Sequence, residues 1–550
     1  MVSFNQNTNL SSKHKLKFHE EKPDLPNLPT QNRKTSPASF YQGTGFSMVQ
    51  VNVDTNGQNI LGDAANEPSI AINPTNPQEM AIGWRQFYNV GSNFMQAGYG
   101  YSTDGGKTWT FPGVVSPGLV FHSDPVLECD SQGNFYYNSL TADFGLYVCK
   151  VFKSTNGGAS WNKGTDAFGG DKEWMTIDRS GGVGSGNIYS YWFSDVSSCS
   201  PGFFTRSTNG GSGFENCIAI AGNPSLGTMT VGINGELYIA GADSLNGIVV
   251  VKSTSAQFAD SIPAWNFVTH VDLDGFITVN LAVNPQGLLG QAIIDVDRST
   301  GTGRGNVYVL ASVTRLSNGD SADVMFVKST DGGMTWSPPK RINDDQGTDH
   351  YQWFGTMSVA PNGRIDAVWL DTRDSPPDSL LSALYYSYSK DEGKTWSVNK
   401  KLSPLFDSHV GWPPRHKMGD YFDMESDEKG AHLAWSNTFN GEQDVYYSYI
   451  TLPINGIAEK DRYLRACSLT NYPNPFQDHT TIRYKISVDC FITLTLFNIY
   501  GKEIKTLINE KQSPGNYILA FSADDLPAGY YFCRLSTASN TETIGLVSIK

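Results

Sequence analysis

Short apolar segments separated by glycine- and asparagine-containing turns recur along most of the chain. Each unit begins with an apolar strand, continues through an aromatic-rich second strand and ends with a third strand. Seven such units begin at or near Glu67, Asp124, Glu173, Gly227, Gln291, Trp353 and Asp420. Short strands with turn signals at even spacing predict an all-β fold.

A turn sequence closes the third strand of several units. It reads Ser-Thr-Asp-Gly-Gly-Lys-Thr-Trp at 102–109, with close copies at 154–161, 329–336 and 389–396 and a weaker one at 207–214. Asp104 and Asn156 are 52 residues apart (156 − 104), whereas Asn209 and Asp331 are 122 apart (331 − 209), which is two units. Self-similarity at such a period predicts a propeller or a solenoid, and the short, evenly spaced strands favour the propeller.

The S-x-D-x-G-x-x-W pattern resembles the Asp-box, or BNR repeat, of sialidase-like β-propellers. Its Asp or Asn accepts hydrogen bonds from its own turn, its glycines take positive φ and its Trp covers the turn. We therefore expect the boxes to brace turns and not to catalyse. We predict a seven-bladed propeller, with a six-bladed ring, in which the fourth unit is an insertion, as the alternative.

The segment 46–53 precedes the first unit and has no unit of its own, while the seventh unit lacks a fourth strand. We expect 46–53 to supply that strand and close the ring, because an open sheet edge is a liability.

The pattern changes after about residue 455. Asn471-Tyr472-Pro473-Asn474-Pro475-Phe476, Leu494 to Gly501 and Leu526 to Phe532 resemble the type A C-terminal sorting domain of the type IX secretion system. The alternating strands themselves predict a small β-sandwich. The resemblance implies export to a secreted or cell-surface location, with the secretion machinery as partner. We predict a disordered leader at 1–42, a propeller at 43–455 and the sandwich at 456–550. No signal peptide is evident in 1–42, so we expect the export signal outside this sequence.

Charge and cysteine content narrow the partners. With 40 Lys and Arg against 54 Asp and Glu, the net charge of −14 argues against nucleic acid or an anionic membrane as partner. No apolar run is long enough for a membrane span, and we expect a monomer. Seven cysteines leave at least one outside an internal disulfide. The alternatives are a Cys199–Cys217 disulfide, a Cys129–Cys149 disulfide and buried free thiols.

Charged and aromatic residues concentrate where the inner strands enter the ring and in the loops between second and third strands, which line one mouth of the channel. The catalytic candidates are Asp124, Glu173, His350 and Tyr351, with Tyr421 as a second candidate nucleophile. The substrate-binding candidates are Arg85, His122, Trp174, Trp353, Arg373, Arg415 and His416. Arginines grip carboxylates, aromatic rings stack on sugars, and carboxylates, His and Tyr supply acid, base or nucleophile.

The resemblance to sialidases implies an arginine triad, for which Arg85, Arg373 and Arg415 are the candidates. We therefore expect an extracellular exo-glycosidase that acts on acidic carbohydrate. The Arg-Ile-Pro motif of that family is absent near Arg85, which leaves a non-catalytic glycan- or protein-binding propeller, or a polysaccharide lyase, as alternatives. We expect no cofactor and no catalytic metal. A structural Ca²⁺ at 344–345 or 371–374 is a further alternative.

Overall fold

The computed structural model describes residues 23–26, 33–43, 45–143, 146–243, 247–451, 467–486, 490–513, 515–522, 526–537 and 541–549. The chain divides into two compact units, Met1–Leu452 and Pro453–Lys550. Most of the predicted leader, and the stretch around the predicted boundary at 455, lie outside the described residues. Within the described parts, no helix has the length and apolar character needed to cross a membrane.

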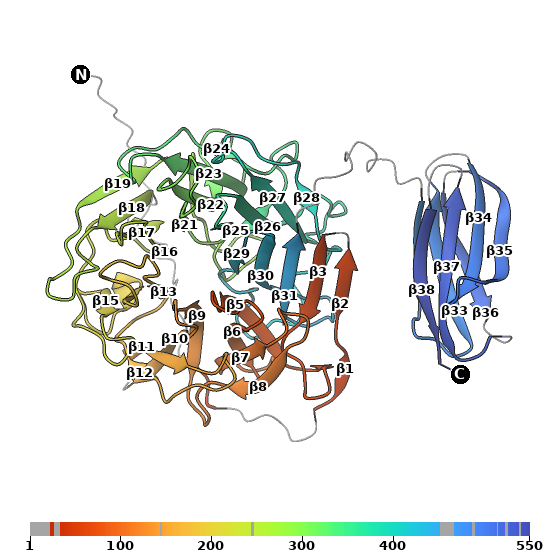
Figure 1. Ribbon diagram of the computed structural model, residues 1–550, viewed down its shortest axis with the longest axis horizontal. Helices are drawn as coiled ribbons and strands as arrows, with labels where there is room; N and C mark the ends of the chain where they lie inside the picture. Colours follow the sequence, from red (N-terminus) through yellow and green to blue (C-terminus); the bar gives the residue numbers. More distant parts are fainter. Residues whose placement is uncertain are drawn as a thin grey trace. The chain divides into compact units, whose positions relative to one another are not determined.

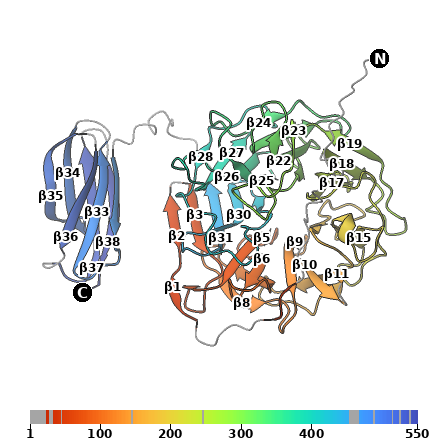
Figure 2. The ribbon, with the colours of Figure 1, turned by 180° about the vertical axis from the view of Figure 1, so that it is seen from behind.

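Antiparallel sheets stand around a common centre in the first unit (Figure 1), and Figure 2 shows the same order from behind. The sheets and strands are β5–β8 (Ala64–Ile72, Met80–Phe87, Gln96–Ser102, Thr110–Val114), β9–β12 (His122–Cys129, Phe135–Asp143, Leu146–Ser154, Thr165–Asp166), β13–β15 (Trp174–Ile177, Ile188–Tyr191, Phe204–Ser207), β16–β19 (Met229–Val231, Leu237–Ala242, Ile248–Ser253, Phe267–Val271), β20–β24 (Gly275–Phe276, Ile293–Val296, Val307–Arg315, Asp323–Ser329, Lys340–Arg341), β25–β28 (Gln352–Val359, Ile365–Asp371, Ala383–Ser389, Lys400–Lys401) and β29–β31 (Asp423–Ser426, Gly430–Asn437, Asp444–Thr451). A short 3-10 helix, η1 (Ser194–Val196), follows β14, and β1 (Thr35–Pro37) pairs with β4 (Gln58–Ile60).

An N-terminal strand completes the last of these sheets. β3 (Phe46–Gln50) pairs with β31 in antiparallel register, with Met48 opposite Ser448, and β2 (Phe40–Gly43) pairs with β3 on its outer side. Phe46 and Met48 are buried in the core of this sheet. The prediction that 46–53 supplies the missing strand is therefore confirmed for 46–50, and the beginning and the end of this unit are joined in one sheet.

The Asp-boxes are turn braces, as their residues predict. In the first box the Asp104 carboxylate accepts hydrogen bonds from the backbone N–H of Lys107 and of Thr108, both at 3.0 Å. Gly106 has φ +81°, and a Cβ there would lie 2.2 Å from a ring carbon of Tyr447 in β31. The box therefore also fixes the packing of one sheet against the preceding one, which only glycine allows at this position.

A disulfide supports the irregular third sheet. Cys199 is bonded to Cys217, while Cys129 and Cys149 are buried free thiols, so the second of the two pairings is wrong. The sheet β13–β15 has three strands, and a single bridge between Phe204 and Ile218 stands beside β15. The disulfide thus ties the chain that replaces an outer strand to its own sheet.

The second unit contains two antiparallel sheets. They are β32–β33–β36 (Cys467–Tyr472, His479–Ile486, Gly515–Ser522) and β35–β34–β37–β38 (Glu503–Gln512, Cys490–Asn498, Gly529–Thr537, Thr541–Ser548). Ile482, Leu494 and Leu535, from both sheets, belong to one buried apolar cluster. This shared core agrees with the predicted sandwich.

Candidate functional site

Each sheet of the ring has a residue with left-handed backbone where its inner strand begins. These residues are Glu67 (φ 51°), Asp124 (45°), Lys172 (59°), Leu226 (55°), Gly290 (146°), Phe354 (55°) and Gly419 (105°). For residues other than glycine this conformation is strained by about 1–3 kcal/mol and is often found at functional sites. Three of them carry charge, and all three lie in consecutive sheets.

These charged residues form a buried ionic cluster with residues of the segment before β29. Lys417 Nζ lies 3.0 Å from Glu67 Oε1 and 2.6 Å from Asp420 Oδ2. Arg85 pairs with Glu67 at 3.1 Å. All four side chains are buried. The cluster therefore joins sheet β5–β8 to residues more than three hundred positions further along the chain.

Lys172 extends the ionic cluster to the second and third sheets. Its ammonium lies 2.7 Å from Asp420 Oδ2 and 3.7 Å from Asp124 Oδ2, and its backbone N–H donates to Asp124 at 3.0 Å. Burial opposes ionisation of Asp124, but Lys172 and Arg85 outweigh it and hold the pKa of this carboxyl well below its usual range. Asp124 is therefore an ionised partner of internal cations.

Glu173 has the opposite character. Burial, reinforced by the negative charge of Asp124, raises its pKa well above the usual range. Its two carboxyl oxygens are buried without a hydrogen-bond partner among the described residues. The structure thus brings three predicted site residues, Arg85, Asp124 and Glu173, to one end of the channel, but buries all of them.

Other predicted site residues lie in the sheet β25–β28. Arg373 pairs with Asp371 at 2.7 Å and with Asp344 at 2.6 Å, and its guanidinium stacks over Tyr385. The Trp353 indole is buried and donates to Ser382 Oγ at 3.1 Å. The ion pairs of Arg373 and Arg85 therefore belong to different clusters among the described residues.

Arg373 also bears on the acidic loops considered for Ca²⁺. Asp344, Asp345 and Asp371 all pair with its guanidinium, so these carboxylates already share a cationic partner, which argues against a Ca²⁺ site there. In the described chain, no group of three or more His, Cys, Asp or Glu side chains is arranged to hold a metal ion.

The remaining candidates are scattered. His122 is buried with Nδ1 3.2 Å from Ser139 Oγ, and burial lowers its pKa to about 4. His416 is exposed and stacks on Trp412, with ring centroids 5.1 Å apart. His350, Tyr351 and Arg415 are half-buried. Their roles stay predictions.

A cavity of about 360 Å³ lies inside the ring and is lined by the inner strand of every sheet. Its lining includes Val126–Glu128 of β9, Trp174–Ile177 of β13, Ile293–Asp295 of β21 and Asp423–Ser426 of β29. This volume is in the range of small-ligand pockets. One of the predicted binding residues, Trp174, contributes to it.

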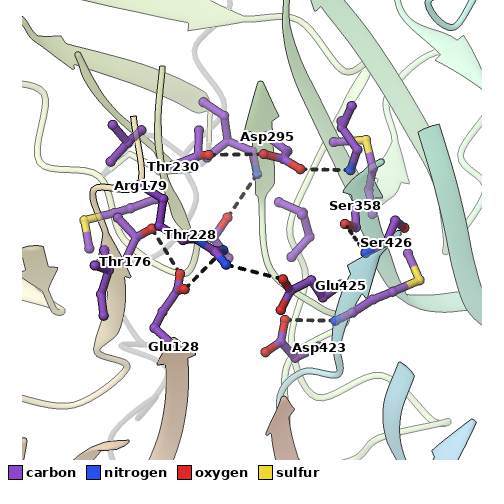
Figure 3. A pocket seen from close by; sticks show the side chains of 18 of the residues that line it. Glu128, Thr176, Arg179, Thr228, Thr230, Asp295, Ser358, Asp423, Glu425 and Ser426 are labelled. Atoms are coloured by element: carbon purple, nitrogen blue, oxygen red, sulfur yellow. Dashed lines mark hydrogen bonds and ion pairs between the residues drawn. The ribbon is translucent and has the colours of Figure 1, made fainter. Parts of the chain in front are cut away.

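Two carboxylates flank one guanidinium in this cavity (Figure 3). Arg179 Nη2 lies 3.4 Å from Glu128 Oε2, and Arg179 Nη1 lies 3.4 Å from Glu425 Oε1. The three side chains are 34 %, 19 % and 32 % exposed, in that order, so they are reachable, unlike the ionic cluster. We call these residues the channel triad.

Burial perturbs the acids of the cavity. It raises the pKa of Glu128 to about 7, with Glu425 adding to the effect and Arg179 opposing it. Burial likewise raises the pKa of Asp423 to about 6, although Ser69 Oγ and the Ile70 N–H donate to this carboxylate. Near neutral pH the Glu128 carboxyl is therefore about half protonated.

Sequence reasoning missed Lys172 of the ionic cluster and all three members of the channel triad. A signal was present, because Asp423 and Glu425 alternate within one inner strand and so face the same side. Glu128 likewise stands near the end of an inner strand. Charged residues at alternate positions of strands that are otherwise apolar indicate a polar channel.

Family models match two parts of the chain. Residues 470–550 match the secretion system C-terminal sorting domain, and residues 101–111 match the BNR/Asp-box repeat. No curated protein matches the sequence significantly. The chain therefore carries an Asp-box repeat and a C-terminal secretion sorting domain. The sorting domain indicates a secreted or cell-surface protein and implies contact with the secretion machinery.

Solved structures resemble the chain at low identity. A Dyadobacter fermentans protein of unknown function has 14 % identity and a TM-score of 0.42, covering 74 % of this chain and 100 % of its own. Trypanosoma rangeli sialidase in complex with the inhibitor DANA has 9 % identity and a TM-score of 0.36, covering 91 % and 89 %. The YCF48 protein bound to D1 peptide has 12 % identity and a TM-score of 0.38, covering 76 % and 98 %. Likeness at this level does not decide between their functions.

Proposed function

We propose that the predicted domain 43–455 is a seven-bladed propeller that is exported and binds extracellular carbohydrate in its channel. The observation that carries the proposal is the channel triad, because it places two carboxylates and a guanidinium, all partly exposed, inside a cavity of about 360 Å³. Such groups hydrogen-bond sugar hydroxyls, and Trp174 adds an aromatic surface to the same cavity. We favour this binding site over a catalytic site at the opposite end of the channel, because Asp124, Glu173 and Arg85 are buried at that end.

Hydrolysis is a second candidate, favoured by the pKa of Glu128. A carboxyl with a pKa of about 7 suits a general acid near neutral pH. Glycosidases use such an acid together with a second carboxylate, and Glu425 stands on the other side of Arg179. In this candidate Glu128 protonates the leaving oxygen and Glu425 acts as base or nucleophile.

The test is a screen of the full chain against sialosides, uronate polysaccharides and neutral glycans, recording both retention and released sugar. We expect retention of at least one glycan, and at least tenfold weaker retention by Glu425→Gln. Glu428→Gln is the matched control, because Glu428 is an exposed neighbour outside the cavity. If wild type releases sugar and Glu128→Gln does not, the activity is hydrolysis. If the folded protein neither retains nor cleaves any of these glycans, both candidate functions are refuted.

A further inference from the structure

The two ends of the channel differ. At the end where the inner strands begin, the ionic cluster closes the centre, and residues 278–290 lie over it. Asn284 donates to Gly419 O at 2.9 Å and accepts from the Met418 N–H at 2.9 Å. The Leu288 N–H donates to Asp420 Oδ1 at 3.0 Å. Two loops and an ionic cluster thus cover this mouth.

An aromatic pair lies beneath the ionic cluster. Tyr421 comes just before β29 in the chain. Its hydroxyl donates a hydrogen bond to Pro125 O in β9 at 2.8 Å, two sheets away around the ring. Its ring meets that of Trp174 edge to face, with centroids 5.4 Å apart. Tyr421 is buried, whereas Trp174 lines the cavity. Trp174 therefore contributes to the cavity lining, although it is itself largely buried, and Tyr421 packs against it.

The other end of the cavity is open. Its lining includes turn residues that follow the inner strands, among them Pro74, Arg298 and Pro361, and all three are exposed. The channel is therefore a blind well with its mouth on the face where the first and second strands of each sheet are joined. A well of this kind accepts the end of a chain and excludes the middle of a long polymer.

Charge inside the well is predominantly acidic. Glu128, Asp423 and Glu425 stand against the single cation Arg179, because Arg298 at the rim is neutralised by Asp295 at 2.8 Å. A ligand carboxylate would meet this surplus of negative charge, and Arg179 is already engaged by Glu128 and Glu425. A ligand amine or hydroxyl, in contrast, can donate hydrogen bonds to the carboxylates of the cavity.

We propose that the channel triad binds the terminal residue of a neutral or amino-sugar glycan, which enters from the strand-turn face, and that it discriminates against uronates and sialosides. This inference rests on the proposed function and adds to it the ligand class, the binding mode and the entrance.

The experiment uses calorimetry on the full chain with linear β-linked glucosamine oligosaccharides, their N-acetylated counterparts, neutral gluco-oligosaccharides and galacturonate oligosaccharides. We expect binding to a glucosamine or neutral series, with galacturonates at least tenfold weaker. We also expect the binding stoichiometry to stay at one protein molecule per oligosaccharide molecule as the oligosaccharide is lengthened from six to about twenty residues. Tighter binding of galacturonates, or several proteins along one long chain, overturns the inference while leaving carbohydrate binding intact. No binding to any probe overturns the inference, and the proposed function falls with it if the wider glycan screen, which includes sialosides, also shows no retention.

Two matched variants test the entrance. Pro361→Trp places an indole at the rim without removing a backbone donor, and we expect at least tenfold weaker affinity. Gln286→Trp places the same group on the exposed loop over the closed end, and we expect less than a twofold change. The reverse result, with both proteins folded by circular dichroism, places the entrance at the strand-entry end and overturns the inference.

Discussion

Glu128 offers a direct test of the electrostatics of the channel. The groups that face it are Arg179, Glu425 and Asp423, with Thr176 donating a hydrogen bond at 3.1 Å. Substitution of Glu128→Gln keeps the shape and the hydrogen-bonding capacity of the protonated carboxyl but removes its titration. The comparison of the two proteins across pH therefore isolates the free energy associated with this one proton.

The magnitude follows from the pKa. A folded-state value of about 7 against the usual 4.5 corresponds to about 3 kcal/mol, at about 1.4 kcal/mol for each tenfold change in proton affinity. Because the folded-state pKa is raised, this contribution is fully present below about pH 4.5 and is lost as pH rises through about 7. Wild type should thus lose about 3 kcal/mol relative to Glu128→Gln between pH 4.5 and pH 8.

The assay is the thermal midpoint of the first unit in both proteins at intervals from pH 4.5 to pH 8. An unfolding entropy of about 0.9 kcal/mol/K for a unit of about 400 residues converts 3 kcal/mol into about 3 °C. We expect the midpoint of Glu128→Gln minus that of wild type to rise by that amount, mostly between pH 5 and pH 7, and to level off above pH 7. A constant difference, or one of opposite sign, refutes the reasoning, and Glu428→Gln should show a constant difference.

Two further substitutions test the architecture by chemical denaturation. Lys417→Met should lower the free energy of unfolding by about 3–5 kcal/mol, because it removes a cation from buried carboxylates. Adding Glu67→Gln to this variant should restore part of the lost stability, whereas Lys394→Met, at an exposed lysine, should have little effect. Met48→Asp should cost about 4 kcal/mol, because it buries a carboxylate in the ring-closing strand, whereas Ser47→Asp, which is less buried, should cost much less; equal losses would contradict the closure role of β3.

Local patterns were predictable from the sequence. The Asp-boxes were identified because their hydrogen bonds run within eight residues, as the bonds from Lys107 and Thr108 to Asp104 show. The closing strand was identified because an unassigned strand at the beginning matched a missing strand at the end. Both inferences need only the chain itself and the rule that sheet edges are paired or covered.

The candidate site was predictable only in part. The structure places Arg85, Asp124 and Glu173 at one end of the channel, Asp124 and Glu173 near the entry of inner strands and Arg85 near the end of a second strand, and their roles stay predictions. Whether this end is open depends on pairs such as Glu67 with Lys417, which are 350 residues apart (417 − 67) and invisible to any local pattern. Arg85 and Asp124 therefore belong to one buried ionic cluster, and Glu173, which follows Lys172 in the chain, is buried as well.

The arginines show why residue type alone does not identify a ligand site. An arginine grips an external carboxylate when its donors are available, yet Arg85 is held by Glu67 and Asn66, and Arg373 by carboxylates including Asp371. Arg179 differs because both of its carboxylate partners stand at 3.4 Å, beyond the 2.7–2.9 Å typical of charge-assisted hydrogen bonds. A ligand hydroxyl can therefore accept from the guanidinium and donate to a carboxylate, whereas a ligand ammonium can donate only to the carboxylates. In the proposed binding mode, recognition thus depends on an ion pair that is close enough to stay ordered and loose enough to admit a ligand.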